Sequence, residues 1–309
     1  MADKPSRALV LYGDGLARFI DSSHTHFHSL ASKASCGFLS LPNASASESE
    51  DERIVREFAI LLDACEAYLN LDANTTKDGC QKSTILTISE RFMGMKAAII
   101  TNNSTLKSFG AKVGLSVLQL NEFIRRNHSD TEPHCEMLKL LGFHDGKTLD
   151  TRQFDLIIVH VGAGEKINDE KGDMEYINSL VGGILCKAQP GSEISSHLHL
   201  SVVMSYGSVS EDDESNLSVL TKKDERNSEL PLLFPRQSYT MKGEIQRKDV
   251  RHHCPMLIAQ WQYAVTRKDV AETFSFEDFK EHGGNLVIPA DRFLHEIAFK
   301  LWKAPKYGA

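Results

Sequence analysis

Acidic side chains follow two apolar segments of this chain, and they could hold a divalent metal ion. Asp14 follows the apolar run Ala8–Tyr12 and is flanked by glycines. Glu165 and Asp169 follow a second apolar run, Phe154–Val161, and the glycines behind it. Glycine lets the backbone approach a metal or a phosphate closely, and carboxylate oxygens suit Mg²⁺ or Mn²⁺ better than Zn²⁺. The alternative is a pair of ordinary polar turns whose charges are solvated.

Two adjacent histidines, His252 and His253, could add nitrogen ligands. They close a segment, residues 234–253, that carries a surplus of basic side chains in an otherwise acidic chain. This surplus could bind an anionic ligand or could neutralise the acidic loops, and we favour neutralisation.

Ser47 and Ser49 are the candidate nucleophiles. Both lie in a small-residue, acidic loop that leads into a helix expected over Asp51–Leu71. A serine at this place is usually an N-cap, yet the free amides and the dipole of a helix start also favour an anion there. The acids around the two serines would repel a phosphate, which counts against a nucleophilic role.

Apolar strands followed by amphipathic helices must position these groups. We expect strands at about residues 8–12, 96–101, 155–161 and 198–204, adjacent in one mostly parallel sheet. The alternation predicts a three-layer α/β/α sandwich in a single domain, residues 1–309. Ligand sites of such sheets lie at the carboxyl ends of the strands.

Further elements are expected along the chain. We expect strands at 37–41, 115–120 and 256–262, and helices at 83–93, 105–112, 135–141, 173–187 and 291–302. Residues 208–229 are acidic and serine-rich without periodicity, and we expect a mobile loop there.

The composition excludes several classes of function. A formal net charge of −7 argues against a general nucleic-acid surface, which needs a basic face. No segment is long enough to cross a bilayer, and the apolar start is too short for a signal peptide. The six cysteines are scattered without metal-ligand spacing, which indicates reduced thiols in a cytoplasmic or nuclear protein.

The order of these elements resembles the alkaline phosphatase superfamily, in particular its cofactor-independent phosphoglycerate mutase branch. The early strand ends in Asp-Gly, as that family's does, and KSTILTISERFMGMKAAIIT is similar to its helix-Gly-Met-strand unit. FDLIIVHVGAGEKINDEKGDMEYINSLVGGIL is similar to its central block, and RHHCPMLI falls where a metal-binding histidine precedes a strand. The resemblance implies an alkaline phosphatase-like fold over most of the chain.

The resemblance also implies a two-metal site that activates a serine and stabilises the transferring phosphoryl group. Asp14 matches a metal ligand of the family. Glu165 stands where the family has Asp, and Asp169 stands where it has His. His252 or His253 matches the last histidine ligand.

Other parts of the family pattern are missing. Tyr206 and Gly207 replace the Asp-His pair, so two ligands of one metal are absent. No Gly-Ser-Asp occurs at the nucleophile position, where the chain has Ser47 and Ser49 among acids. The cap domain of the mutases is replaced by a short segment, Ala73–Lys82.

Three hypotheses of function follow. The first is a catalytically degenerate member of this fold, a binding or scaffold protein without a cofactor. The second is a phosphoester hydrolase or phosphotransferase with one Mn²⁺ or Mg²⁺ ion. The third is an unrelated doubly wound protein, although no dinucleotide or P-loop fingerprint is present. The partner would be an unidentified protein or a small phosphorylated ligand, and neither nucleic acid nor membrane.

Metal analysis separates the first two hypotheses, and the strand order separates the third. The charge of the residual site is a further question. If Asp14, Glu165 and Asp169 converge, the three carboxylates cannot all stay charged without a cation, or at least one pKa rises. The cation could be a divalent ion, or the chain's own Lys166, Arg251 or a protonated histidine. The alternative is that the three side chains point into water.

Overall fold

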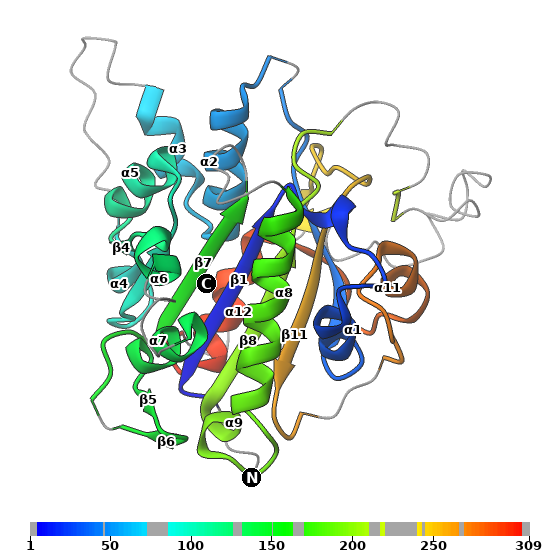
Figure 1. Cartoon of the computed structure of the whole chain (residues 1–309). Coiled ribbons are helices and arrows are strands. Elements are labelled where there is room, and N and C mark those ends of the chain that lie inside the picture. Colours follow the sequence, from blue (N-terminus) through cyan, green and yellow to red (C-terminus); the bar gives the residue numbers. More distant parts are fainter. Residues whose placement is uncertain are drawn as a thin grey trace.

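The computed structural model describes residues 5–45, 47–72, 86–125, 132–149, 151–162, 170–209, 217–219, 240–242, 245–265 and 269–304. Its centre is an eight-stranded sheet with the order β12-β2-β11-β8-β1-β7-β3-β4 (Figure 1). The strands are β1 (Arg7–Asp14), β2 (Ser35–Ser40), β3 (Ala97–Ile100), β4 (Ser116–Leu118), β7 (Leu156–Gly162), β8 (Leu198–Met204), β11 (Met256–Gln262) and β12 (Leu286–Pro289). Only β11 runs antiparallel to its neighbours in this sheet, so the fold is a mostly parallel α/β sheet.

The four strands expected to be adjacent are adjacent. β8, β1, β7 and β3 are consecutive and parallel, and Val10 of β1 pairs with Ile158 of β7 on one side and Ser201 of β8 on the other. Their near-continuous apolar runs are typical of strands covered on both faces. This part of the sequence prediction is confirmed.

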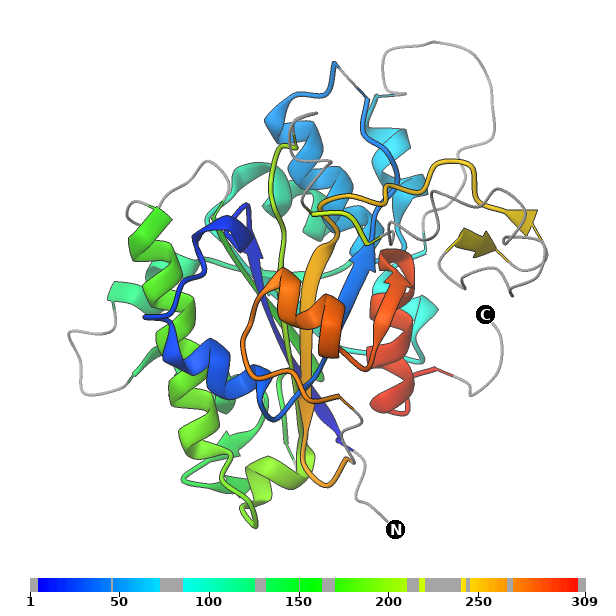
Figure 2. The same cartoon turned by 90° about the vertical axis from the view of Figure 1, so that its right-hand side faces the viewer.

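Helices cover both faces of the sheet, which gives three layers (Figures 1 and 2). The first layer has its own apolar core with one face of the sheet and consists of α1 (Thr25–Ala31), α6 (Leu120–Arg125), α7 (Pro133–Leu140), α8 (Glu170–Lys187), α9 (Glu193–His197) and α11 (Phe276–His282). The other layer consists of α2 (Glu50–Leu61), α3 (Cys65–Asp72), α4 (Ile88–Arg91), α5 (Ser104–Lys112) and α12 (Phe293–Lys300). Two short hairpins pair β5 (Phe143–His144) with β6 (Lys147–Thr148), and β9 (Met241–Lys242) with β10 (Ile245–Gln246); η1 (Ala17–Phe19) and η7 (Ala290–Arg292) are 3₁₀ turns.

The alternation of side chains in β1 decides where its last residue points. Leu9 and Leu11 belong to the core under α8, whereas Val10 and Tyr12 belong to the core under α2. Side chains in a strand alternate between faces with a period of two residues. Asp14 therefore lies on the α2 face, at the carboxyl end of β1.

Several predicted elements differ in extent. The single helix expected over residues 51–71 is two helices, α2 and α3, because Asp63 takes a left-handed conformation (φ 48°) that interrupts the helix. The strand expected at 115–120 is shorter, because helix α6 begins at Leu120. Strand β12 and helix α11 were not predicted. Of the predicted loop 208–229, only residues 208–209 and 217–219 are described.

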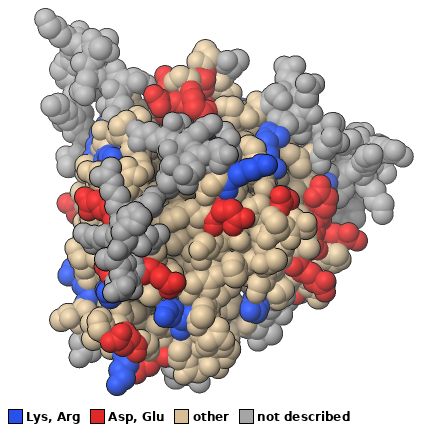
Figure 3. Space-filling view, viewed as in Figure 1, with Lys and Arg blue, Asp and Glu red and all other residues tan. Residues whose placement is uncertain are grey.

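The surface of the described chain mixes both signs of charge. On the face shown in Figure 3, acidic and basic side chains are scattered, and a broad central area carries neither. Within the described ranges, every helix is too short or too polar to cross a lipid bilayer.

Candidate functional site at the carboxyl edge of the sheet

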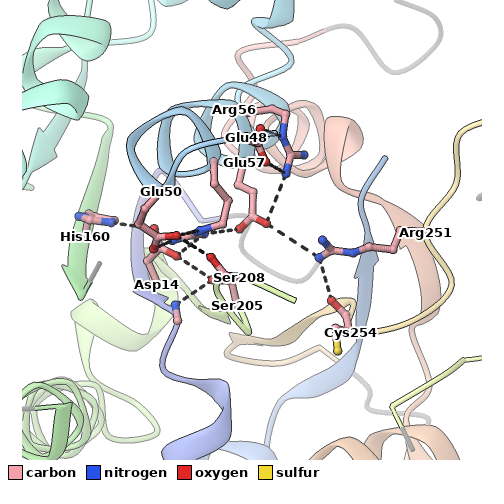
Figure 4. A network of polar contacts seen from close by, with 12 residues as sticks. Asp14, Glu48, Glu50, Arg56, Glu57, His160, Ser205, Ser208, Arg251 and Cys254 are labelled. Atoms are coloured by element: carbon pink, nitrogen blue, oxygen red, sulfur yellow. Dashed lines mark hydrogen bonds and ion pairs between the residues drawn. The ribbon is translucent and has the colours of Figure 1, made fainter. Parts of the chain in front are cut away.

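Polar side chains converge on Asp14 at the carboxyl ends of three parallel strands (Figure 4). The Asp14 side chain is buried, and the hydroxyl of Ser205, directly after β8, donates to its Oδ1 at 2.9 Å. His160 of β7 places Nε2 3.4 Å from Oδ2. The other ring nitrogen of His160, Nδ1, lies 3.0 Å from the hydroxyl of Thr101, which follows β3. The strand ends thus fix the position and orientation of the carboxylate.

The backbone supports this arrangement closely. The N–H of Gly15 donates to Ser205 Oγ at 2.9 Å, which orients the hydroxyl toward Asp14. Gly162, opposite Asp14 in the ladder, has φ of 104°, and a Cβ there would lie 2.3 Å from the carbonyl oxygen of Asp14. Only glycine fits that backbone conformation and that space.

Helix α2 brings a guanidinium group to this carboxylate. Arg53 is 4% exposed, and its NH1 donates to Asp14 Oδ1 at 2.9 Å and to Glu57 Oε2 at 3.0 Å. Its Nε and NH2 donate to the two oxygens of Glu50 at 2.9 and 2.7 Å. Glu50, Arg53 and Glu57 face the same side of α2 because they are three and four residues apart. A single arginine therefore binds three carboxylates.

A second arginine, Arg251, lies next to the same cluster, in the segment before β11. Arg251 is buried; its NH2 donates to the carbonyl of Cys254 at 3.0 Å and lies 3.9 Å from Glu57 Oε1 (Figure 4). Arg56 lies at the same distance from that oxygen and binds Glu48 with two hydrogen bonds. Glu57 is thus surrounded by three guanidinium groups, of which only Arg53 makes a hydrogen bond to it.

The two buried carboxylates differ in pKa. Burial alone would raise the pKa of Asp14, but the hydrogen bond with His160 and the charge of Arg53 lower it to about 2. Burial raises the pKa of Glu57 to about 7, and the negative charge of Asp14 adds to that rise. Asp14 is therefore the ionised member at neutral pH, and Glu57 exchanges its proton near neutrality.

The structure shows only part of the predicted metal-ligand set. Glu165 and Asp169 lie outside the described residues, as does Lys166. Asp14 lies where the family pattern predicts, but both of its oxygens contact donors of the chain itself. We predicted Arg251 as a candidate cation for this site, and it faces Glu57 instead; the cation on Asp14 is Arg53. The spacing of Arg53 from Glu50 and Glu57 was the signal that could have found it.

The predicted histidine ligands lie beside strand β11. Val219 donates its N–H to the carbonyl of His252, and His253 forms a β-bridge with Ser218. Burial and the neighbouring His253 lower the pKa of His252. Asp14 and these two histidines do not form a three-ligand set. Within the described ranges, such a set, with ligand atoms within 4.8 Å of one another, occurs once, in Glu132, His134 and Cys135.

The two candidate nucleophiles lie at the start of α2. Ser49 is its N-cap: its Oγ accepts from the N–H of Glu52 at 3.4 Å and donates to the Glu52 carboxylate at 2.8 Å. Ser47 is exposed, and its hydroxyl lies 3.1 Å from that of Ser45. The capping box satisfies two backbone N–H groups at the helix start, those of Ser49 and Glu52, so Ser49 has a structural role that needs no phosphate.

The residues that replace the family's Asp-His pair carry no metal ligand. Tyr206 is buried, with the guanidinium of Arg18 5.3 Å from the centre of its ring. Burial raises the pKa of its phenol. Gly207 has φ of 70°, and a Cβ there would lie 3.1 Å from the Cα of Gly15. The end of β8 therefore packs against the turn after β1.

Comparison with known proteins concerns the fold. No family model matches the chain, and no curated protein sequence matches it. The PH0037 protein from Pyrococcus horikoshii is similar over 100% of both chains, with 12% identity and a TM-score of 0.55. The cofactor-independent phosphoglycerate mutase from Thermoplasma acidophilum DSM 1728 matches 96% of this chain and 100% of its own, with 10% identity and a TM-score of 0.47.

An alkaline phosphatase from the Antarctic bacterium TAB5 matches 99% of this chain and 100% of its own, with 9% identity and a TM-score of 0.38. The three-layer architecture and the mostly parallel eight-stranded sheet agree with the resemblance found in the sequence. The chain therefore shares the fold of the PH0037 protein, with three layers around a mostly parallel eight-stranded sheet.

Proposed function

We propose that this protein is a catalytically degenerate member of the alkaline phosphatase-like fold and acts as a binding or scaffold protein. The observation that carries the proposal is the pairing of Asp14 with Arg53 at 2.9 Å, both buried. Asp14 is the residue that matches a metal ligand of the family, and a guanidinium group of the chain already compensates its charge. We place the protein in the cytoplasm or nucleus, on the spacing of its cysteines.

Electrostatics supports this proposal. A divalent ion on Asp14 would lie within a few ångströms of the Arg53 guanidinium, and like charges at that distance repel strongly in a buried site. The Arg53 side chain could not move away from Asp14 without breaking three further hydrogen bonds, which it makes to Glu50 and Glu57. Metal binding would therefore require the whole α2 cluster to rearrange.

The serines support the same conclusion. A serine nucleophile needs a metal or a base that lowers the pKa of its hydroxyl. Ser49 instead donates to a carboxylate within its own capping box, and Glu50, Asp51 and Glu52 make the first turn of α2 acidic. An incoming phosphate would meet negative charge at this position.

A second candidate function is a metal-dependent phosphoester hydrolase or phosphotransferase with a reduced one-metal site. Asp14 and His160 favour it, because a carboxylate and an imidazole of the metal-ligating kind lie 3.4 Å apart at the carboxyl edge. Mn²⁺ or Mg²⁺ would be the metal, with Glu165 and Asp169 as the further oxygen ligands.

Hydrolysis of p-nitrophenyl phosphate by the purified full chain separates the two functions. We expect the same negligible rate with Mn²⁺, with Mg²⁺ and with EDTA, and the same rate in Asp14→Asn. Metal content of the protein as isolated is measured in parallel by mass spectrometry. Robust metal-dependent hydrolysis that Asp14→Asn abolishes would overturn the proposal and establish the second candidate.

A further inference from the structure

A hollow of about 210 Å³ lies at the amino edge of the sheet, away from the Asp14 cluster. His199, in the wall of the hollow, pairs with Ala8 of β1. Ala8 is six residues before Asp14, so the hollow and the Asp14 cluster are separated by about 20 Å along the strand, at ~3.3 Å per residue. The hollow is lined by Lys33, Ser35, His199, Gln260, Gln262, Val265, Asn285 and Lys300.

The strand pattern explains this polar wall. Every second side chain of β8 and β11 belongs to the core under α8, among them Leu198, Leu200, Ala259 and Trp261. The side chains between them therefore point to the other face of the sheet, which α12 covers. At this end of the two strands the intervening residues are His199, Gln260 and Gln262, and Gln262 pairs directly with His199. Helix α12 ends at Lys300, which lines the same hollow.

Two buried polar atoms in this wall have no hydrogen-bond partner among the residues that the structure describes. They are Nδ1 of His199, which is 0% exposed, and Nε2 of Gln260, which is 7% exposed. The other ring nitrogen of His199 lies 3.0 Å from the hydroxyl of Ser201. Buried polar side-chain atoms almost always have a partner, so a molecule in the hollow is the group that would complete these bonds.

The charges of the lining residues indicate which sign of charge a bound molecule carries. Of the described residues that line the hollow, two are lysines and none carries a carboxylate. Burial lowers the pKa of Lys300, and the charge of Glu296, one turn earlier in α12, opposes this lowering. Glu296 is not among the residues that line the hollow. Burial also keeps His199 neutral, so that its ring offers one N–H.

We propose that this hollow is a binding site for a small oxyanion, either a phosphate or a carboxylate. Lys300 and Lys33 supply positive charge, and Gln260 supplies a buried amide donor. The volume lies below the ~300–1,000 Å³ of pockets that take drug-sized ligands, so the ligand has few atoms. The site is separate from the carboxyl-edge cluster and is independent of the function proposed for it.

Isothermal titration calorimetry of the full chain with sodium phosphate, and separately with sodium malonate, tests the proposal, with sodium chloride of equal ionic strength as reference. We expect saturable one-to-one binding of at least one anion. Lys300→Met should weaken it at least tenfold. Lys96→Met is the matched control, because Lys96 is an exposed lysine at the amino end of β3 outside the hollow, and it should bind like the wild type.

Val265→Trp is a second test that does not depend on the buried residues. Val265 is 51% exposed at the rim of the hollow, so a larger side chain can block the entrance while the core stays unchanged. We expect this variant to lose binding with an unchanged melting temperature. The anion that binds identifies the source of the oxyanion. Binding of neither anion, or equal binding in wild type, Lys300→Met and Val265→Trp, would overturn the proposal.

Discussion

The two edges of the central sheet differ in how their buried polar side chains are paired. At the carboxyl edge, both oxygens of Asp14 have partners within the chain, and Arg53 uses three of its nitrogens on carboxylates. At the amino edge, His199 and Gln260 each leave a buried atom without a partner. At the carboxyl edge, where sheets of this class usually bind ligands, Arg53 compensates the charge of Asp14, although the buried Glu57 Oε1 has no hydrogen-bond partner among the described residues. At the amino edge, the unpartnered atoms belong to neutral side chains that line a hollow.

On the function proposed above, the chain keeps the fold without keeping a metal site at the edge where such folds usually have one. In a cluster of buried charges that the chain itself compensates, removing one member leaves an uncompensated charge, and the paired groups have little left to offer a metal or a substrate. Neutral side chains with unpartnered polar atoms around a hollow can bind a ligand, and replacing one of them should change stability little. The following substitutions should therefore affect stability strongly at the carboxyl edge and weakly at the amino edge.

Arg53→Met should have the largest effect. It removes the cation from Asp14 and Glu57 and leaves uncompensated buried charge, which typically costs about 3–5 kcal/mol of the free energy of unfolding. Urea denaturation measures this loss. The matched control is Arg292→Met, an exposed arginine at the start of α12, which should change stability by less than about 0.5 kcal/mol. A loss below about 1 kcal/mol in Arg53→Met would mean that the cluster does not depend on its arginine.

Glu57 should make stability fall as the pH rises toward neutrality. Its pKa is raised from 4.5 to about 7, so between these values the native chain holds a proton that the unfolded chain has released. The stabilisation is complete below about pH 4.5 and is lost by about pH 7, a change of about 3 kcal/mol at ~1.4 kcal/mol per pKa unit.

Glu57→Gln should lack this component. The stability of the variant relative to the wild type should therefore rise by about 3 kcal/mol between pH 4.5 and 7.5, in denaturation curves measured at each pH. Asp14 contributes with the opposite sign and only in acid, because its pKa is lowered to about 2. A difference between variant and wild type that stays constant with pH would contradict the raised pKa of Glu57.

Gln260→Leu should have the smallest effect. Replacing an unpaired buried amide by an apolar group of similar shape is nearly neutral or stabilising, so we expect a change within about 1 kcal/mol. Urea denaturation under the conditions used for Arg53→Met gives the comparison directly. A loss as large as that of Arg53→Met would show that Gln260 has a partner inside the chain, and the contrast between the two edges would disappear.

The sequence predicted the layers and the central strands because these follow from local patterns. Four apolar runs of strand length, most of them followed by a helical pattern, were enough to place β8, β1, β7 and β3 side by side. The pattern over residues 51–71 could not show the interruption, because Asp63 is one polar residue whose left-handed conformation depends on the packing around it. Strand β12 is short and partly exposed at an edge of the sheet, so its apolar pattern is weak.

The site was predicted less completely than the fold. The position of Asp14 at a strand end was correct, because it depends on the strand pattern. The identity of its partner was missed, because Arg53 reaches Asp14 only through the docking of α2 on that face of the sheet. A single sequence shows the spacing of Glu50, Arg53 and Glu57 on the helix. The contact between Arg53 and Asp14, 39 residues apart in sequence, depends on the tertiary structure.

Titration of Mn²⁺ into wild type and Asp14→Asn by calorimetry tests the central claim most directly, namely that Arg53 holds the position on Asp14 that a metal would need. We expect the two isotherms to be the same, with no Mn²⁺ uptake that depends on Asp14. A one-to-one Mn²⁺ complex in the wild type that Asp14→Asn abolishes would contradict it, since the carboxylate would then have exchanged its arginine for the metal.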